Sequence, residues 1–163
     1  MSGKKSLKIL IVCLGNICRS PTAHGVLSEM IISKSLKGTI EVDSAGTGSW
    51  HVGENPDVRS IRAASSRGYD ISKLTARQVK DTDFSEFDYL LAMDKSNLSE
   101  LNKLCPERYK HKLELFLRFG SSGESSVPDP YYDENSGFEV VFDLIEDTCE
   151  KFLEYVIKKH KLN

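Results

Sequence analysis

The sequence predicts an α/β fold in which an open, four-stranded, parallel twisted sheet has helices on both faces. Residues 7–12 (LKILIV) form a short, almost uninterrupted apolar run, which is typical of a strand buried on both faces. Three more strand-like runs follow at residues 39–43, 87–93 and 112–116. Helical patterns lie between these runs, and alternating strands and helices favour a parallel sheet.

The helices are predicted from their boundaries and apolar spacing. Ser20 and Pro21 fit the N-cap and first position of a helix that follows the first strand. A second helix is expected over residues 55–66, with Gly68 near its C-terminal cap, and a third over residues 95–104. A long final helix is indicated by an apolar stripe: Phe138, Val141, Phe142, Ile145, Cys149, Phe152, Leu153 and Val156.

Composition places the chain among ordinary globular proteins. Its 163 residues, with 39% hydrophobic and 28% charged side chains, suit a single domain over residues 1–163. The net charge of −2 does not indicate a nucleic-acid partner. The apolar run near the N-terminus is too short for a secretion signal or a membrane span, so we expect a cytoplasmic protein with no membrane span. Its four scattered cysteines are expected to be thiols.

The loop after the first strand has the composition of an anion site. It reads Cys13-Leu14-Gly15-Asn16-Ile17-Cys18-Arg19-Ser20-Pro21. Gly15 and Asn16 tolerate positive φ, so the backbone can curl with its N–H groups directed at an anion. The following helix adds the positive end of its dipole, and Arg19 adds a fork of donors that matches two phosphate oxygens. These fields favour a thiolate at Cys13, placed to attack a bound phosphorus atom.

Other uses of this loop fit the sequence less well. A cysteine that ends a buried strand is often only a small core residue, and Arg19 could simply solvate a helix start. Cys13 and Cys18 are too far apart for a thioredoxin-type pair, and no second Cys/His pair completes a zinc site. The glycine-rich signatures of nucleotide sites are absent. We therefore expect no metal and no cofactor.

A phosphatase that expels a phenolate needs a proton donor. Asp129 is the best candidate, because Pro128 and Pro130 stiffen its segment and the serine-rich residues 120–126 precede it. An acidic residue between prolines is also a common turn former, so this position alone does not establish catalysis.

The loop, together with Asp129-Pro130-Tyr131-Tyr132, closely resembles the low-molecular-weight protein tyrosine phosphatases. Residues 43–47 (DSAGT), Trp50 followed by Val52-Gly53, residues 76–78 (ARQ) and residues 87–97 also match, so the resemblance covers essentially the whole chain. It implies hydrolysis of protein phosphotyrosine and small aryl phosphates through phosphocysteine. Phosphotyrosine-containing proteins would be its partners, and inorganic phosphate and vanadate its inhibitors.

The resemblance also implies roles for individual residues. Cys13 is the expected nucleophile, Arg19 the phosphate clamp, and Asp129 the acid and then the base. Ser20 is expected to stabilise the departing thiolate, and Asn16 to hold the loop through Ser20 and Ser44. Cys18 is expected to form a reversible disulfide with Cys13 under peroxide. The loop is completed by Gly15 and Ile17, and the substrate ring is expected to lie among Leu14, Trp50, Tyr131 and Tyr132.

Two positions leave questions open. The family often has histidine two residues before the Ala-Arg-Gln motif, where it helps to hold the loop asparagine, but this chain has Leu74. Either another group supports Asn16 or the loop is less rigid. Asp94 matches an acidic residue of the family and either tunes the protonation of the site or begins a helix.

Three rival functions fit the sequence less well. Arsenate reductases of the thioredoxin-coupled type share the loop, but they need two more cysteines in a mid-chain segment, which this chain lacks. Protein-arginine phosphatases carry threonine in place of Ile17 and lack the aromatic pair. A phosphotyrosine-binding module without catalysis would usually have lost Cys13 or Asp129.

Overall fold

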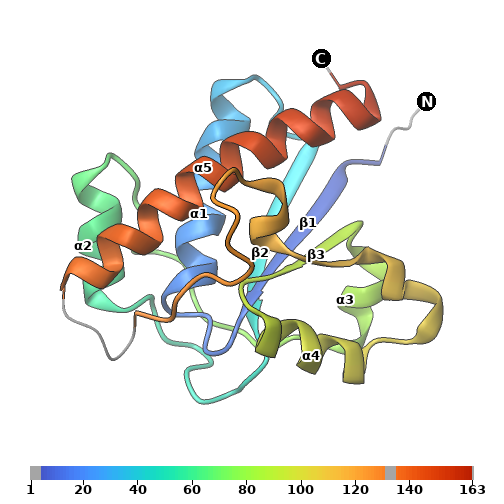
Figure 1. Ribbon diagram of the computed structural model, residues 1–163, viewed down its shortest axis with the longest axis horizontal. Helices are drawn as coiled ribbons and strands as arrows, with labels where there is room; N and C mark the ends of the chain where they lie inside the picture. The colour runs from blue at the N-terminus through green and yellow to red at the C-terminus, as the bar shows by residue number, and fades with distance from the viewer. Residues whose placement is uncertain (1–4, 131–134, 163) are drawn as a thin grey trace.

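A computed structural model describes residues 5–130 and 135–162 and confirms the predicted fold class (Figure 1). Its sheet contains β1 (Leu7–Cys13), β2 (Ile40–Gly46), β3 (Tyr89–Ala92) and β4 (Leu113–Leu115). The strand order is β2-β1-β3-β4, and every neighbouring pair is parallel. β1 is therefore central, and its carboxyl end lies beside the ends of β2 and β3.

Alternate residues of β1 face two different layers of core. Ile9 and Ile11 belong to the cluster that includes residues of α1 (Arg19–Ser33) and α5 (Asn135–His160). Leu10 and Val12 belong to a second cluster with residues of α3 (Asp81–Glu86) and α4 (Lys95–Leu104). All four side chains are fully buried, as the apolar run predicted.

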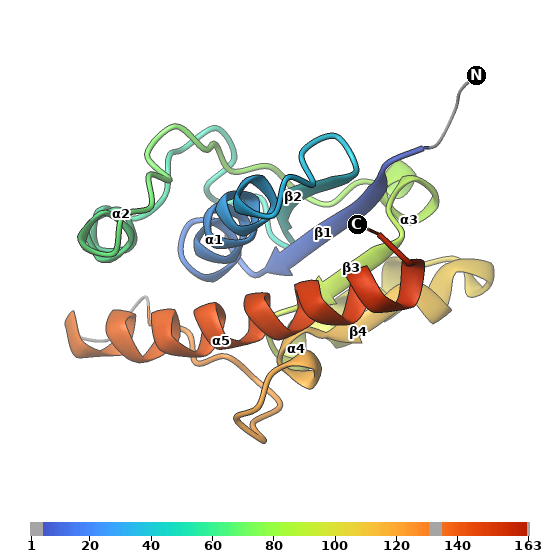
Figure 2. The same cartoon turned by 90° about the horizontal axis from the view of Figure 1, so that it is seen from above.

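The remaining helices surround this sheet. α2 (Val58–Ser66) packs on α5, which extends along the length of the molecule and also contacts α1 (Figure 2). Two short 3₁₀ helices, Glu107–Lys112 and Phe116–Phe119, flank β4 and were not predicted. In the described part of the chain, no helix combines the length and apolar character that crossing a membrane requires.

Several element boundaries differ from the sequence prediction. α1 begins at Arg19, so the prediction of Ser20 as N-cap is wrong: Cys18 holds that position, and the Ser20 hydroxyl is used elsewhere. α2 begins at Val58 because the Asp57 side chain accepts the Arg59 N–H and caps the helix there. α3 was not predicted, because its six residues are too short for a helical repeat. Gly68 has a φ of +87° just after α2, as expected for a residue that ends a helix.

Candidate active site

The sulfur of Cys13 lies at the carboxyl end of β1, where it has two polar contacts. The backbone N–H of Asn16 points at Cys13 Sγ over 3.2 Å, and Ser20 Oγ lies 3.0 Å from the same sulfur. Both contacts come from the loop and first turn that lead into α1, whose positive dipole end lies on this side. The side chain of Cys13 is therefore surrounded by groups that stabilise a negative sulfur.

Asn16 holds the curve of this loop. Its φ is +58°, a left-handed conformation that asparagine tolerates better than most residues. Its side-chain Nδ2 donates to Ser20 Oγ over 2.7 Å, and its Oδ1 accepts the backbone N–H of Arg77 over 3.0 Å. The contact expected between Asn16 and Ser44 is not formed among the described residues.

Ser44 has a different partner, which comes from α1. Its hydroxyl pairs with His24 Nδ1 at 2.9 Å, and its backbone N–H donates to Asp43 Oδ1 at 2.8 Å. Burial lowers the pKa of His24, although the nearby Asp43 opposes this effect. The Leu74 side chain packs against the core, and its carbonyl accepts from Asn55 Nδ2. The group that supports Asn16 from this segment is the backbone N–H of Arg77.

The end of β2 supports the loop from behind. Cys13 and Leu14 accept backbone hydrogen bonds from Thr47 and Gly48, respectively, each over 2.9 Å. Gly46 lies so close that a Cβ on it would stand 2.7 Å from the Leu14 carbonyl oxygen and 3.2 Å from the Asn16 nitrogen. The close approach therefore requires glycine at position 46.

Arg19 connects three segments around the sulfur. It is only 2% exposed, and its Nη1 donates to Asp94 Oδ2 at 2.6 Å and to the Val127 carbonyl at 2.9 Å. Its Nη2 lies 3.7 Å from Asp129 Oδ2. Burial alone lowers the pKa of Arg19, but negative charge at Cys13 and the bond to Asp94 outweigh it and raise the pKa. Arg19 therefore stays a cation despite its burial.

Asp94 begins a helix, which is one of the two roles that the sequence left open for it. Its Oδ1 accepts the Asn97 N–H over 2.7 Å at the N-cap of α4. Its other oxygen holds Arg19. One carboxylate thus fixes both the start of α4 and the orientation of the guanidinium.

These residues surround a pocket of about 400 Å³. Its lining includes Cys13, Arg19 and Asp129 together with the predicted Leu14, Gly15, Ile17, Cys18 and Trp50. Leu14 and Trp50 are exposed at 43% and 70%, so apolar surface is open to solvent beside the sulfur. Tyr131 and Tyr132, also predicted to line this site, lie outside the described residues.

Sequence reasoning did not assign His51 to the pocket. His51 lies against Gly15 and pairs with Glu54 Oε1 at 3.1 Å. The only sequence signal was its position directly after Trp50.

Cys18 is a buried residue of the loop and lines the same pocket as Cys13. Burial, with a smaller effect from the charge of Asp57, raises the pKa of the Cys18 thiol to about 12. Cys18 is therefore protonated at neutral pH. Among residues 5–130 and 135–162, no group of three or more His, Cys, Asp or Glu side chains is arranged to hold a metal ion.

A sequence model described as low molecular weight phosphotyrosine protein phosphatase matches residues 8–162. The chain belongs to this family. Its members are phosphatases, so the protein is a hydrolase with phosphotyrosine phosphatase activity.

Individual relatives cover nearly the whole chain. A putative low molecular weight protein-tyrosine-phosphatase of Synechocystis is 44% identical over 149 residues, which span 90% of this chain and 94% of the relative. The crystal structure of a protein tyrosine phosphatase from Entamoeba histolytica, with Hepes in its active site, matches with a TM-score of 0.90 and 43% identity, covering 96% of this chain and 100% of that one. A Drosophila arginine phosphatase matches with a TM-score of 0.84 and 33% identity, covering 91% and 97%.

Replacing Gly46 with alanine tests the support of the loop by β2. The new methyl group has to push the Leu14 carbonyl away, so we expect Gly46→Ala to lower the free energy of unfolding by about 1–3 kcal/mol and to weaken phosphate-analogue binding. Chemical denaturation and vanadate inhibition measure the two effects.

Gly123→Ala is the matched control. Gly123 has a φ of +78° with open space around it, so alanine there costs about 1 kcal/mol of backbone strain without touching the loop. Equal vanadate affinity in Gly46→Ala and wild type would contradict the role given to Gly46.

Proposed function

We propose that this enzyme hydrolyses protein phosphotyrosine and small aryl phosphates through a phosphocysteine intermediate formed on Cys13. The observation that carries the proposal is the convergence of Cys13, Arg19 and Asp129 on one pocket. The three come from the end of β1, the start of α1 and the segment before α5, so their meeting is a property of the fold rather than of local sequence.

The loop is proposed to bind the phosphate, and Arg19 supports this role. Its Nη1 is occupied by Asp94 and Val127, whereas Nη2 has only the longer 3.7 Å ion pair with Asp129, and no described residue hydrogen-bonds to Nε. These two atoms form one edge of the guanidinium, which can donate to two phosphate oxygens at once. The pocket also lies at the N-terminal, positive end of the α1 dipole, which favours binding of a dianion there.

In the first step, the thiolate of Cys13 attacks phosphorus while the P–O bond to the phenol breaks. Asp129, in its protonated form, gives its proton to the departing phenolate oxygen. In the second step, Asp129 takes a proton from a water molecule, which attacks phosphorus and breaks the P–S bond. Ser20 donates to the sulfur and stabilises the thiolate as it leaves.

A flat aromatic substrate suits the exposed apolar surface at the mouth. Leu14 and Trp50 offer that surface, and Tyr131 and Tyr132 remain part of the proposed wall. The similarity to an arginine phosphatase keeps phosphoarginine as the principal rival substrate. A disulfide relay of the arsenate-reductase type is disfavoured, because Cys149 is fully buried among the core side chains of α5.

The remaining expectations belong to the same proposal. A single domain is supported by the central strand β1, which contributes to both core clusters. A cytoplasmic location is consistent with four cysteines that are all free thiols.

Cys13→Ser tests the covalent step. We expect the rate of phosphotyrosine hydrolysis to fall by about 10⁴-fold or more, because the serine hydroxyl is a far weaker nucleophile, while phosphate and vanadate still bind. Phosphate release from phosphotyrosine, phosphoserine and phosphoarginine peptides measures activity and selectivity, and EDTA should change nothing in wild type. Residual activity above a few per cent, or faster release from phosphoarginine, would contradict the proposal.

Asp129→Ala tests the proton donor. We expect the rate to fall by roughly 10²–10⁴-fold for phosphotyrosine and by much less for p-nitrophenyl phosphate, whose leaving group needs little protonation. The ratio of the two rate losses, measured at the same pH, is the readout. Equal losses on both substrates would remove Asp129 as the acid.

The raised pKa of Cys18 predicts that the response of the enzyme to peroxide depends on pH. Peroxide converts the Cys13 thiolate to a sulfenic acid, and the sulfur of Cys18 then displaces hydroxide, released as water, to form the disulfide. Because the pKa of Cys18 is raised to about 12, its thiolate is scarce at neutral pH and increases as pH rises. We therefore expect disulfide formation to be faster at pH 9 than at pH 7, as measured by mass spectrometry. Sulfonate on Cys13 with no disulfide at either pH would defeat the protective role.

A further inference from the structure

A short segment after α2 connects two parts of the site. Residues 76–79 lie beside the end of β2, where Gly46 donates to the Arg77 carbonyl and Val79 donates to the Gly46 carbonyl. The same segment exchanges backbone hydrogen bonds with the loop that carries Trp50 and His51: Gly53 donates to Ala76, and Ala76 donates to Glu54. It therefore touches both the support of the catalytic loop and the wall of the pocket.

From this segment, the backbone N–H of Arg77 sets the direction of a chain of hydrogen bonds. It donates to Asn16 Oδ1, so the Asn16 amide must present its NH₂ group to Ser20 Oγ. The Ser20 oxygen then accepts that bond and keeps its single hydrogen for Cys13 Sγ. The direction of hydrogen bonding that suits a thiolate at Cys13 is thus set from outside the loop.

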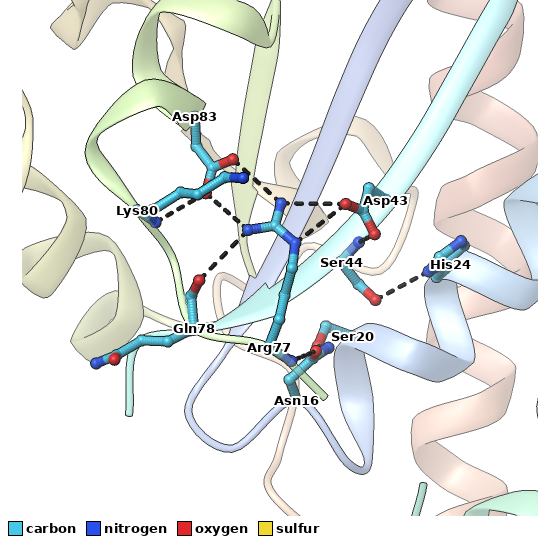
Figure 3. A network of polar contacts seen from close by, with 9 residues as sticks. All are labelled: Asn16, Ser20, His24, Asp43, Ser44, Arg77, Gln78, Lys80 and Asp83. Carbon is cyan, nitrogen blue, oxygen red and sulfur yellow. Dashed lines mark hydrogen bonds and ion pairs between the residues drawn. The ribbon is translucent and has the colours of Figure 1, made fainter. Parts of the chain in front are cut away.

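The Arg77 side chain anchors its own backbone. Its two terminal nitrogens donate to both oxygens of Asp83 at 3.0 and 3.1 Å, and Nε donates to Asp43 Oδ2 at 3.1 Å (Figure 3). The Asp83 side chain is 1% exposed and also accepts the Lys80 N–H at the start of α3. A buried carboxylate requires such partners, and a bidentate pair fixes geometry as well as charge.

We propose that Arg77 is a positioning residue for catalysis, whose ion pairs with Asp83 and Asp43 hold its backbone N–H against Asn16 and so keep the Ser20 hydroxyl donating to Cys13. Any residue except proline could supply an N–H at position 77. The backbone bonds of residues 76–79 hold the segment beside β2, and the Arg77 side chain adds a second anchor by bonding both carboxylates. The inference rests on the proposed function, because it assumes that Cys13 works as a thiolate.

The test compares Arg77→Met and Arg77→Lys with wild type. Two quantities are measured: the midpoint pH of Cys13 alkylation by iodoacetate, located by mass spectrometry, and kcat and KM for p-nitrophenyl phosphate. For Arg77→Met we expect the midpoint to rise by about one pH unit, equivalent to about a tenfold loss of thiolate below the midpoint, and kcat to fall with it. Arg77→Lys should recover part of both, since lysine keeps the charge without the fork.

Arg67→Met is the matched control. Arg67 pairs with Glu139, Asp143 and Glu146 of α5, away from the loop, so its loss should lower the melting temperature without moving the alkylation midpoint. If Arg77→Met only lowers the melting temperature, as the control does, the proposal is overturned.

Asp43→Asn covers the case in which Arg77→Met does not fold. The Asp43 side chain is 44% exposed, and the variant leaves the buried Asp83 pair intact, so it should fold and move the midpoint in the same direction by less. An unchanged midpoint in both Asp43→Asn and Arg77→Lys would overturn the proposal. A wild-type enzyme without Cys13-dependent phosphotyrosine hydrolysis would instead refute the proposed function, because the alkylation comparison does not depend on turnover.

Discussion

The contact on which the site depends is that of the Cys13 sulfur with the Asn16 N–H and the Ser20 hydroxyl. A sulfur anion in a largely buried position is costly unless donors surround it. The parallel sheet makes the arrangement possible, because the central strand β1 ends where β2 and β3 also end. The chain turns there into α1, which brings the donors and the helix dipole to one point.

The position of the Arg19 guanidinium beside the sulfur is stabilised electrostatically. A guanidinium that is almost fully buried needs acceptors of its own, and it finds them in Asp94 and the Val127 carbonyl. Asp94 is in turn fixed as the cap of α4, and the Val127 N–H donates to Met93 just beyond β3. The clamp is therefore held by elements that the core already fixes, and binding of an anion does not have to order it.

The sequence allowed the fold class, the β1–α1 loop and α4 to be predicted, because each has a local signal. The long apolar run marks β1, and Asp94 sits at the start of a helical pattern. The role of Ser20 was partly misread: its position suggests a cap, but its oxygen faces Cys13 and Asn16. Local propensity describes what a hydroxyl can do for its own helix, and it does not show a competing partner elsewhere.

Long-range polar pairs were the part that sequence could not supply. Ser44 meets His24 rather than Asn16, and Asn16 meets the backbone of Arg77, which is 61 residues away. The Ala-Arg-Gln motif points to this segment as a neighbour of the loop asparagine, but a backbone donor carries no residue signature, so the motif does not show which group makes the contact. The placement of His51 and the buried pair of Arg77 with Asp83 likewise depend on how loops pack against the sheet edge.

Rapid quenching of the wild-type enzyme during turnover of an aryl phosphate, followed by mass spectrometry of its peptides, tests the central claim most directly. The account predicts that the mass of one phosphoryl group appears on the peptide containing Cys13, and that it disappears as substrate is exhausted. A phosphoryl group on His51 or another side chain, or full turnover with none on Cys13 at any time, would contradict it.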